Sequence, residues 1–168
     1  MISTSSFATK ILTVATILGG ALSARATPMS SRQSAHGVLS APTNGLVVAE
    51  GTSFPFEFHD SNWCEDGYSQ ISVWLTDYVP TTSNLNSTGQ FPEGEYDYYF
   101  GSFLIPNFGL PVLAGSVPPP WSLVLPPLTG LNTGDEVYLA VVETGTACPP
   151  GINVPPQYEV TSLAMTVG

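Results

Sequence analysis

Apolar and polar residues alternate in short runs over residues 37–168, and no long stretch has the period of an amphipathic helix. Fifteen of the sixteen prolines and fourteen of the sixteen glycines lie in this part of the chain, mostly between these runs. Alternation gives a strand one buried face and one wetter face, so the pattern predicts a single all-β domain. The spacing is typical of an immunoglobulin-like or fibronectin-III-like sandwich of seven or eight short antiparallel strands. We expect strands at residues 38–39, 46–48, 53–59, 70–79, 96–104, 121–125, 136–143 and 158–167.

Two of these runs depart from simple alternation. Residues 136–143 are apolar on both faces, which predicts a central strand. In the run at 158–167 the apolar phase changes midway, and a one-residue bulge near Thr161 and Ser162 would explain the change.

Residues 80–94 are polar and rich in turn residues, so they predict a long loop.

The N-terminal residues have the features of a secretory signal peptide. Lys10 precedes an apolar run at residues 11–22, and small residues follow it, including Ala24 and Ala26. The run is shorter than the roughly 20 residues that span a bilayer, although a membrane anchor or a buried helix would also be apolar. The C-terminus lacks the hydrophobic tail of a GPI signal, so we expect a secreted, extracellular product without a membrane anchor. The expected organisation is a signal peptide at 1–26, a disordered lead-in at 27–36 and a domain at 37–168.

Removal of the signal peptide would leave a strongly acidic chain. Lys10 and Arg25 lie within it, so Arg32 would face 13 acidic residues and the formal charge would be −12. One cation cannot neutralise a run of phosphates, which excludes nucleic acid as a partner, and anionic membrane surfaces are disfavoured for the same reason. Negative charge also keeps copies apart, so we expect a soluble monomer.

Residues 122–140, with a leucine, a turn and Tyr138, resemble the passage from strand E to strand F of immunoglobulin-like and fibronectin-III-like domains. The resemblance implies a sandwich with a tyrosine corner at Tyr138. Ala140 stands where antibody domains place their second core cysteine, so the resemblance is to the architecture. Residues 39–45 resemble the immunoglobulin-like domain of the Knh-type family of yeast cell-wall synthesis. Residues 62–68 resemble a short sequence motif of small secreted proteins of filamentous fungi.

The two cysteines, Cys64 and Cys148, indicate a disulfide, because an even number of cysteines in a secreted chain is usually paired. In an immunoglobulin-like sandwich the two loops that carry them lie at the same end, so the resemblance implies that the bridge can form. Two free buried thiols are the alternative. The bridge would hold together two loops that bind ligands in antibodies.

The loop around Cys64 carries the candidate ligand-binding residues. Aromatic faces on a rigid loop can stack on a sugar ring, while carboxylates and amides bind its hydroxyls. The alternatives are that Trp63 caps the core and that the acidic side chains are simply solvated; their spacing matches no EF-hand calcium loop. The candidates are Trp63, Tyr68, Asp60, Asn62, Glu65 and Asp66.

The sequence contains few residues or motifs for glycosylation, catalysis or metal binding. Asn86 begins an N-glycosylation sequon in the predicted loop, so we expect a glycan there. There is no Gly-x-Ser-x-Gly nucleophile motif, and we expect no cofactor. One exception stays open: His36 and His59 could chelate copper, because a chain that began at His36 would resemble the copper-dependent polysaccharide monooxygenases.

The sequence therefore favours a secreted non-enzymatic module, associated with a cell wall or carbohydrate, that binds a polysaccharide or glycoprotein through disulfide-pinned loops. One alternative is a copper-dependent oxidoreductase that uses His36 and His59. Another is a secreted effector that binds a host protein.

Overall fold

In the computed structural model the described residues are 37–146, 148 and 155–168, and all of them fall in one compact unit. The expected signal peptide and lead-in lie outside the described residues. The described chain is all-β apart from one short 3-10 turn, η1 (Thr82–Asn84), and it contains no helix long and apolar enough to cross a membrane. The strands are β1 (Val38–Ala41), β2 (Leu46–Val48), β3 (Ser53–Pro55), β4 (Glu57–His59), β5 (Tyr68–Thr76), β6 (Tyr98–Pro106), β7 (Ser122–Val124), β8 (Glu136–Gly145) and β9 (Gln157–Val167).

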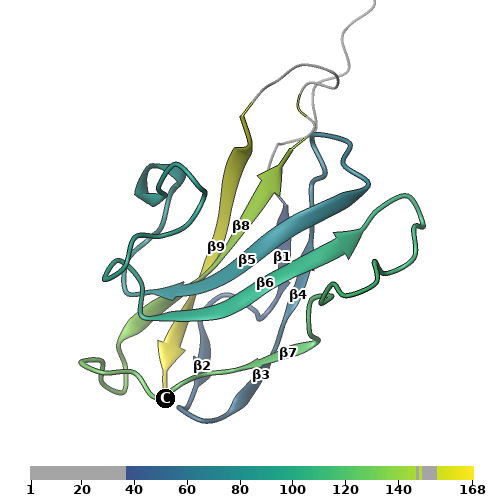
Figure 1. The fold of residues 1–168 in the computed structure, drawn as a ribbon. Helices are drawn as coiled ribbons and strands as arrows, with labels where there is room; N and C mark the ends of the chain where they lie inside the picture. The colour runs from purple at the N-terminus through teal and green to yellow at the C-terminus, as the bar shows by residue number, and fades with distance from the viewer. Residues whose placement is uncertain (1–36, 147, 149–154) are drawn as a thin grey trace, which may run out of the picture. The chain divides into compact units, whose positions relative to one another are not determined.

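The strands form one large sheet and two small ones. The five-stranded sheet has the order β2-β9-β8-β5-β6, and the two-stranded sheets are β1-β4 and β3-β7. All pairs are antiparallel except β2 and β9, which run parallel. Figure 1 shows β5 and β6 crossing in front of β1 and β4. Because β8 lies between β9 and β5, the prediction of a central strand at 136–143 is confirmed.

One face of the five-stranded sheet and the inner sides of β3, β4 and β7 enclose the main core. Alternation along residues 53–59 buries three phenylalanines there, and every second residue of β5 and β8 meets them. Each large apolar side chain buried in this way contributes roughly 1.5–3 kcal/mol. The buried members are Val48, Phe54, Phe56, Phe58, Ile71, Val73, Leu75, Leu123, Leu125, Leu128, Val137, Leu139, Val141, Met165 and Val167.

The strand predicted at 53–59 is divided at Phe56 into two strands with different partners. β3 pairs with β7, whereas β4 pairs with β1. The burial alternation continues unchanged across the division, with Phe54, Phe56 and Phe58 all facing the core. The chain therefore keeps its direction and changes only its neighbour.

A second, smaller core covers the opposite face of the five-stranded sheet. The segment predicted as a polar loop at 80–94 folds back over this face and buries Phe91 against Trp74 of β5. The ring centroids of Trp74 lie 5.6 Å from Phe91 and 4.8 Å from Tyr96, with near-perpendicular planes that favour edge-to-face contact. The sheet is thus covered on both faces over part of its area.

The prediction of a bulge at Thr161 and Ser162 is wrong. β9 pairs with β8 in one continuous register over its whole length. Tyr158 and Val160 pack on the second core, whereas Met165 faces the main core. The apolar phase changes along the strand because its first half is covered on one face of the sheet and its second half on the other.

Tyr138 does not form the corner implied by the immunoglobulin resemblance. Its hydroxyl donates to the carboxylate of Glu136, two residues earlier in β8, whereas a tyrosine corner uses a backbone acceptor upstream. A nearby charged acceptor explains the difference, because charge-assisted hydrogen bonds are stronger than neutral ones.

We expect Phe91→Ala to lower the free energy of unfolding by roughly 3–5 kcal/mol, because it leaves a cavity beside Trp74. Val47→Ala is the matched control, since Val47 is exposed on β2 and its truncation should change stability by less than about 0.5 kcal/mol. Urea unfolding followed by Trp fluorescence measures both. Equal, small losses in the two variants would contradict a second core.

Candidate binding surface at the disulfide end

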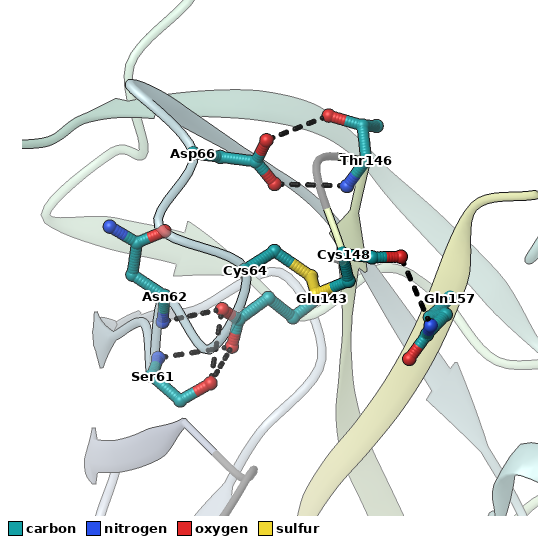
Figure 2. Close-up of a disulfide and its surroundings, with 8 residues drawn as sticks. All are labelled: Ser61, Asn62, Cys64, Asp66, Glu143, Thr146, Cys148 and Gln157. Carbon is teal, nitrogen blue, oxygen red and sulfur yellow. Dashed lines mark hydrogen bonds between the residues drawn. A yellow bond between two sulfur atoms is a disulfide. The ribbon is translucent and has the colours of Figure 1, made fainter. Parts of the chain in front are cut away.

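The predicted disulfide between Cys64 and Cys148 is confirmed. Cys64 lies in the connection from β4 to β5 and Cys148 follows β8, and their Cα atoms are 4.7 Å apart despite 84 residues of separation. A side chain at Gly145 would collide with the Cys64 sulfur and the Trp63 ring. Glycine therefore lets the Cys64 loop lie directly on the end of β8. Figure 2 shows the bridge itself with the polar residues around it.

Glu143 of β8 gives the same loop a second attachment. Its side chain is only 2% exposed, and its two carboxylate oxygens accept the backbone N–H groups of Ser61 at 3.1 Å and Asn62 at 3.0 Å (Figure 2). Burial raises the pKa of the Glu143 carboxyl, the hydrogen bonds from Ser61 and Asn62 oppose this rise, and the charge of Asp60 adds to it. With donors on both oxygens, this carboxylate anchors the loop.

Asp66 and Asn107 extend the attachments to two further segments. The buried Asp66 carboxylate accepts the backbone N–H and the hydroxyl of Thr146, each at 2.9 Å. The Asn107 side-chain amide donates to the Asp66 carbonyl at 2.9 Å and to the Ser69 hydroxyl at 2.8 Å, and its backbone N–H donates to the Gly67 carbonyl. The connection after β6 is thereby fixed to the same loop as the disulfide.

The acidic and amide candidates of this loop differ in what their side chains are free to do. Asp60 accepts the Ser69 hydroxyl, so it and Asp66 are engaged in internal hydrogen bonds. Asn62 and Glu65 both adopt left-handed backbone angles, with φ of 42° and 56°. Asn62 Oδ1 is buried without a hydrogen-bond partner among the described residues, whereas the Glu65 side chain is exposed. Of the four, Glu65 presents its carboxylate to solvent.

The two aromatic candidates are both half-buried. Trp63 packs beside the disulfide on Gly145, which fits the capping role and still leaves part of its surface accessible. The Tyr68 hydroxyl donates to the Pro111 carbonyl at 3.1 Å, and Leu110 lies against Gly67. Tyr68 is thus held in place by the connection that follows β6.

That connection, residues 107–121, carries an exposed apolar surface that sequence reasoning missed. Phe108 is 73% exposed and Trp121 is 87% exposed. A detectable signal was present, because apolar residues between closely spaced prolines and glycines have no strand to bury them. The exposed members are Phe108, Leu110, Val112, Leu113, Val117 and Trp121.

The remaining candidates lie elsewhere. His36 falls outside the described residues, and His59 is exposed on β4 with its ring nitrogen 3.3 Å from the Glu57 carboxylate. No group of three or more His, Cys, Asp or Glu side chains in the described chain is placed to hold a metal ion. Asn86 is exposed, and its side-chain oxygen accepts the backbone N–H of Thr88 at 2.9 Å and its hydroxyl at 2.7 Å. This Asx turn keeps the sequon at the surface.

Comparisons with known proteins give this site no counterpart. No family model, no curated protein and no solved structure matches the chain. The function is therefore inferred from the sequence and from the geometry of the site.

We expect Glu143→Ala to lower the free energy of unfolding by roughly 1–3 kcal/mol, because it leaves the N–H groups of Ser61 and Asn62 without their acceptor. Glu143→Gln keeps one acceptor oxygen and should lose less. Burial raises the folded pKa of Glu143 above its unfolded value, so the folded protein holds this proton more tightly.

The stability that Glu143 contributes is therefore full below its unfolded pKa and falls as the pH rises through the raised folded pKa. The deficit of Glu143→Ala should be larger at about pH 4 than at about pH 7. Urea titrations of both proteins at the two pH values measure the difference. A deficit that grows with pH would contradict the direction of the pKa shift.

Replacing both cysteines by alanine should lower the free energy of unfolding by roughly 2–5 kcal/mol, because the bridge closes a long loop and restricts the unfolded chain. Guanidinium unfolding of the secreted wild-type and double-variant proteins measures the change. Ser87→Ala, an exposed substitution remote from the bridge in sequence, controls for handling of the protein. A double variant as stable as the wild type would contradict the role of the bridge.

Proposed function

We propose that this protein is a secreted, non-enzymatic, immunoglobulin-like module that binds a cell-wall polysaccharide or glycoprotein through the surface at its disulfide end. The sheet order β9-β8-β5 supports the fold part of this proposal, because strands G, F and C are neighbours in immunoglobulin-like sandwiches. The apolar run after Lys10 supports secretion, and the disulfide fits an oxidising compartment.

The observation that carries the proposal is the combination of rigid attachment and exposed apolar side chains at one end of the domain. The bridge and the carboxylates of Glu143 and Asp66 fix the Cys64 loop, and Asn107 fixes the following connection to it. Next to these attachments lie Tyr68 and the exposed Phe108. Ordered loops on a rigid scaffold bind without a large loss of conformational entropy.

The chemistry of this surface suits a neutral sugar polymer. Aromatic rings stack on the apolar faces of sugar rings, and an exposed carboxylate such as that of Glu65 can accept hydrogen bonds from hydroxyls. The described chain contains 13 acidic residues and no Lys or Arg, so anionic polymers would be repelled. A neutral wall polysaccharide would not be repelled.

The test is retention of the purified secreted protein on insoluble chitin, β-1,3-glucan and cellulose. We expect retention on one polymer, and a roughly tenfold or greater loss of affinity for Tyr68→Ala or Phe108→Ala, because each removes an aromatic contact. Trp63→Ala should weaken retention too, because it removes the accessible part of this ring. Val79→Ala is the matched control, since Val79 is exposed beyond the opposite end of β5.

Two outcomes would contradict the proposal. If the wild-type protein stays in the supernatant with all three polymers, the polysaccharide is the wrong ligand class. If retention is unchanged in the Tyr68 and Phe108 variants, the site lies elsewhere. Sequencing the mature N-terminus also tests the copper alternative, because that chemistry needs His36 at the first position.

A further inference from the structure

β4 has one edge that no strand of the described chain covers. Its first edge pairs with β1, through Val38 opposite His59 and Leu39 opposite Phe58. The two-stranded sheet ends there, so the second edge of β4 has no strand beside it. A free strand edge presents backbone donors and acceptors that can pair with another extended chain.

The sequence explains why β7 does not cover this edge. In the β3-β7 ladder Pro55 lies opposite Ser122, and hydrogen bonds run from Leu125 N–H to the Thr52 carbonyl and from Phe56 N–H to the Trp121 carbonyl, each at 3.0 Å. Hydrogen-bonded positions of an antiparallel ladder recur every second residue. The next such pair in this register is Phe58 with Pro119.

Pro119 cannot complete that pair, because proline has no backbone N–H. It is the middle residue of three successive prolines, 118–120, that precede Trp121. The ladder therefore stops at Phe56, while the burial alternation of Phe54, Phe56 and Phe58 stays in phase. The peptide groups of Phe58 consequently face away from β1, toward the side that the prolines leave uncovered.

A groove occupies this position, with a volume of about 260 Å³. Its lining includes the exposed Trp121 and all three residues of β4. Ile105, at the end of β6, also contributes to the lining. The lining residues are Phe56, Glu57, Phe58, His59, Ile105, Pro119, Pro120 and Trp121.

Charge restricts what can enter the groove. Glu57 lies in its lining, and the chain continues from His59 directly into Asp60. All three Lys and Arg residues of the protein precede residue 37, so the described chain has no Lys or Arg beside Glu57, and its basic neighbour in the lining is His59, with a ring nitrogen at 3.3 Å. An acidic occupant would be repelled, whereas a cationic one would be attracted and steered toward the groove.

We propose that the groove between the free edge of β4 and residues 119–121 binds an extended, cationic segment of a partner protein, which adds to the sheet as a strand beside Glu57–His59. The backbone of the segment pairs with β4, as in other cases of strand addition. Alternate side chains enter the groove against Trp121, and the intervening cations face Glu57 and solvent. This site is separate from the proposed polysaccharide surface, which depends on Tyr68 and Phe108.

The probe is an eight-residue peptide of alternating Lys and Val, acetylated, amidated and labelled for fluorescence polarisation with the full secreted protein. We expect saturable binding that weakens as salt rises. A peptide of alternating Glu and Val tests the sign of the charge. The Lys-Val peptide with every second backbone nitrogen methylated removes its N–H donors on one edge, and both methylation phases are tested; one of them should abolish binding.

Two variants locate the site on the protein. Trp121→Ala should weaken binding of the Lys-Val peptide about tenfold or more, because it removes the apolar wall. Glu57→Gln should weaken it about threefold and flatten its salt dependence. Val124→Ala is the matched control, being exposed on the neighbouring β7 and absent from the groove lining. Tyr68→Ala should leave peptide binding unchanged, because Tyr68 is absent from the groove lining.

Four results would overturn the proposal. These are no binding of the Lys-Val peptide up to about 1 mM, equal binding of both methylated peptides, equal binding of the Glu-Val peptide, and full binding by Trp121→Ala. Sedimentation of the protein alone can give a fifth result that overturns the proposal. If wild type forms a dimer that Trp121→Ala disrupts, the occupant of the edge is a second copy of this chain.

Discussion

The bridge between Cys64 and Cys148 is the constraint on which the organisation of this end of the domain depends. It joins the chain just before β5 to the chain just after β8, two strands that are already neighbours in the sheet. The loop it holds contains two residues with left-handed backbone angles, Asn62 and Glu65, which cost conformational energy that the surroundings must supply. Glu143 supplies part of it through its bonds to Ser61 and Asn62, so the covalent and the polar attachments act on the same few residues.

The five-stranded sheet gives this end a stiff base because it is covered on both faces. The main core packs against one face, and the Trp74 cluster with Phe91 packs against part of the other. A strand buried on both sides has few low-cost fluctuations, so the ends of β5 and β8 are fixed points for the loops attached to them. The contrast with β4 is informative, since three prolines end the neighbouring ladder and leave its edge open. The domain thus has loops fixed by the disulfide at one end and an unpaired strand edge at β4, and the two features suit different kinds of ligand.

Much of the fold could be predicted from local patterns, and the failures share one cause. Alternation located the strands, and the doubly apolar run at 136–143 correctly indicated a central position. The phase change in β9 was misinterpreted as a bulge, because sequence periodicity cannot distinguish a break in register from a change in which face is covered. Local patterns also carry no information on long-range contacts. Residues 80–94 were therefore predicted as a polar loop, although Phe91 is buried. The disulfide could be anticipated from cysteine count and topology. The internal engagement of Asp60 and Asp66, and the exposure of Trp121, depend on tertiary contacts that spacing does not encode.

The proposed binding surface at the disulfide end is rigid before any ligand arrives. Amide hydrogen exchange of the free protein, followed by NMR, measures this rigidity residue by residue. We expect the N–H groups of Ser61, Asn62 and Asn107 to exchange slowly, in the range of the β5 and β8 amides, because Glu143 and Gly67 accept them. Exchange of these three amides at the rate of an unstructured peptide would show that the loops are open in the free protein and would contradict a preformed surface.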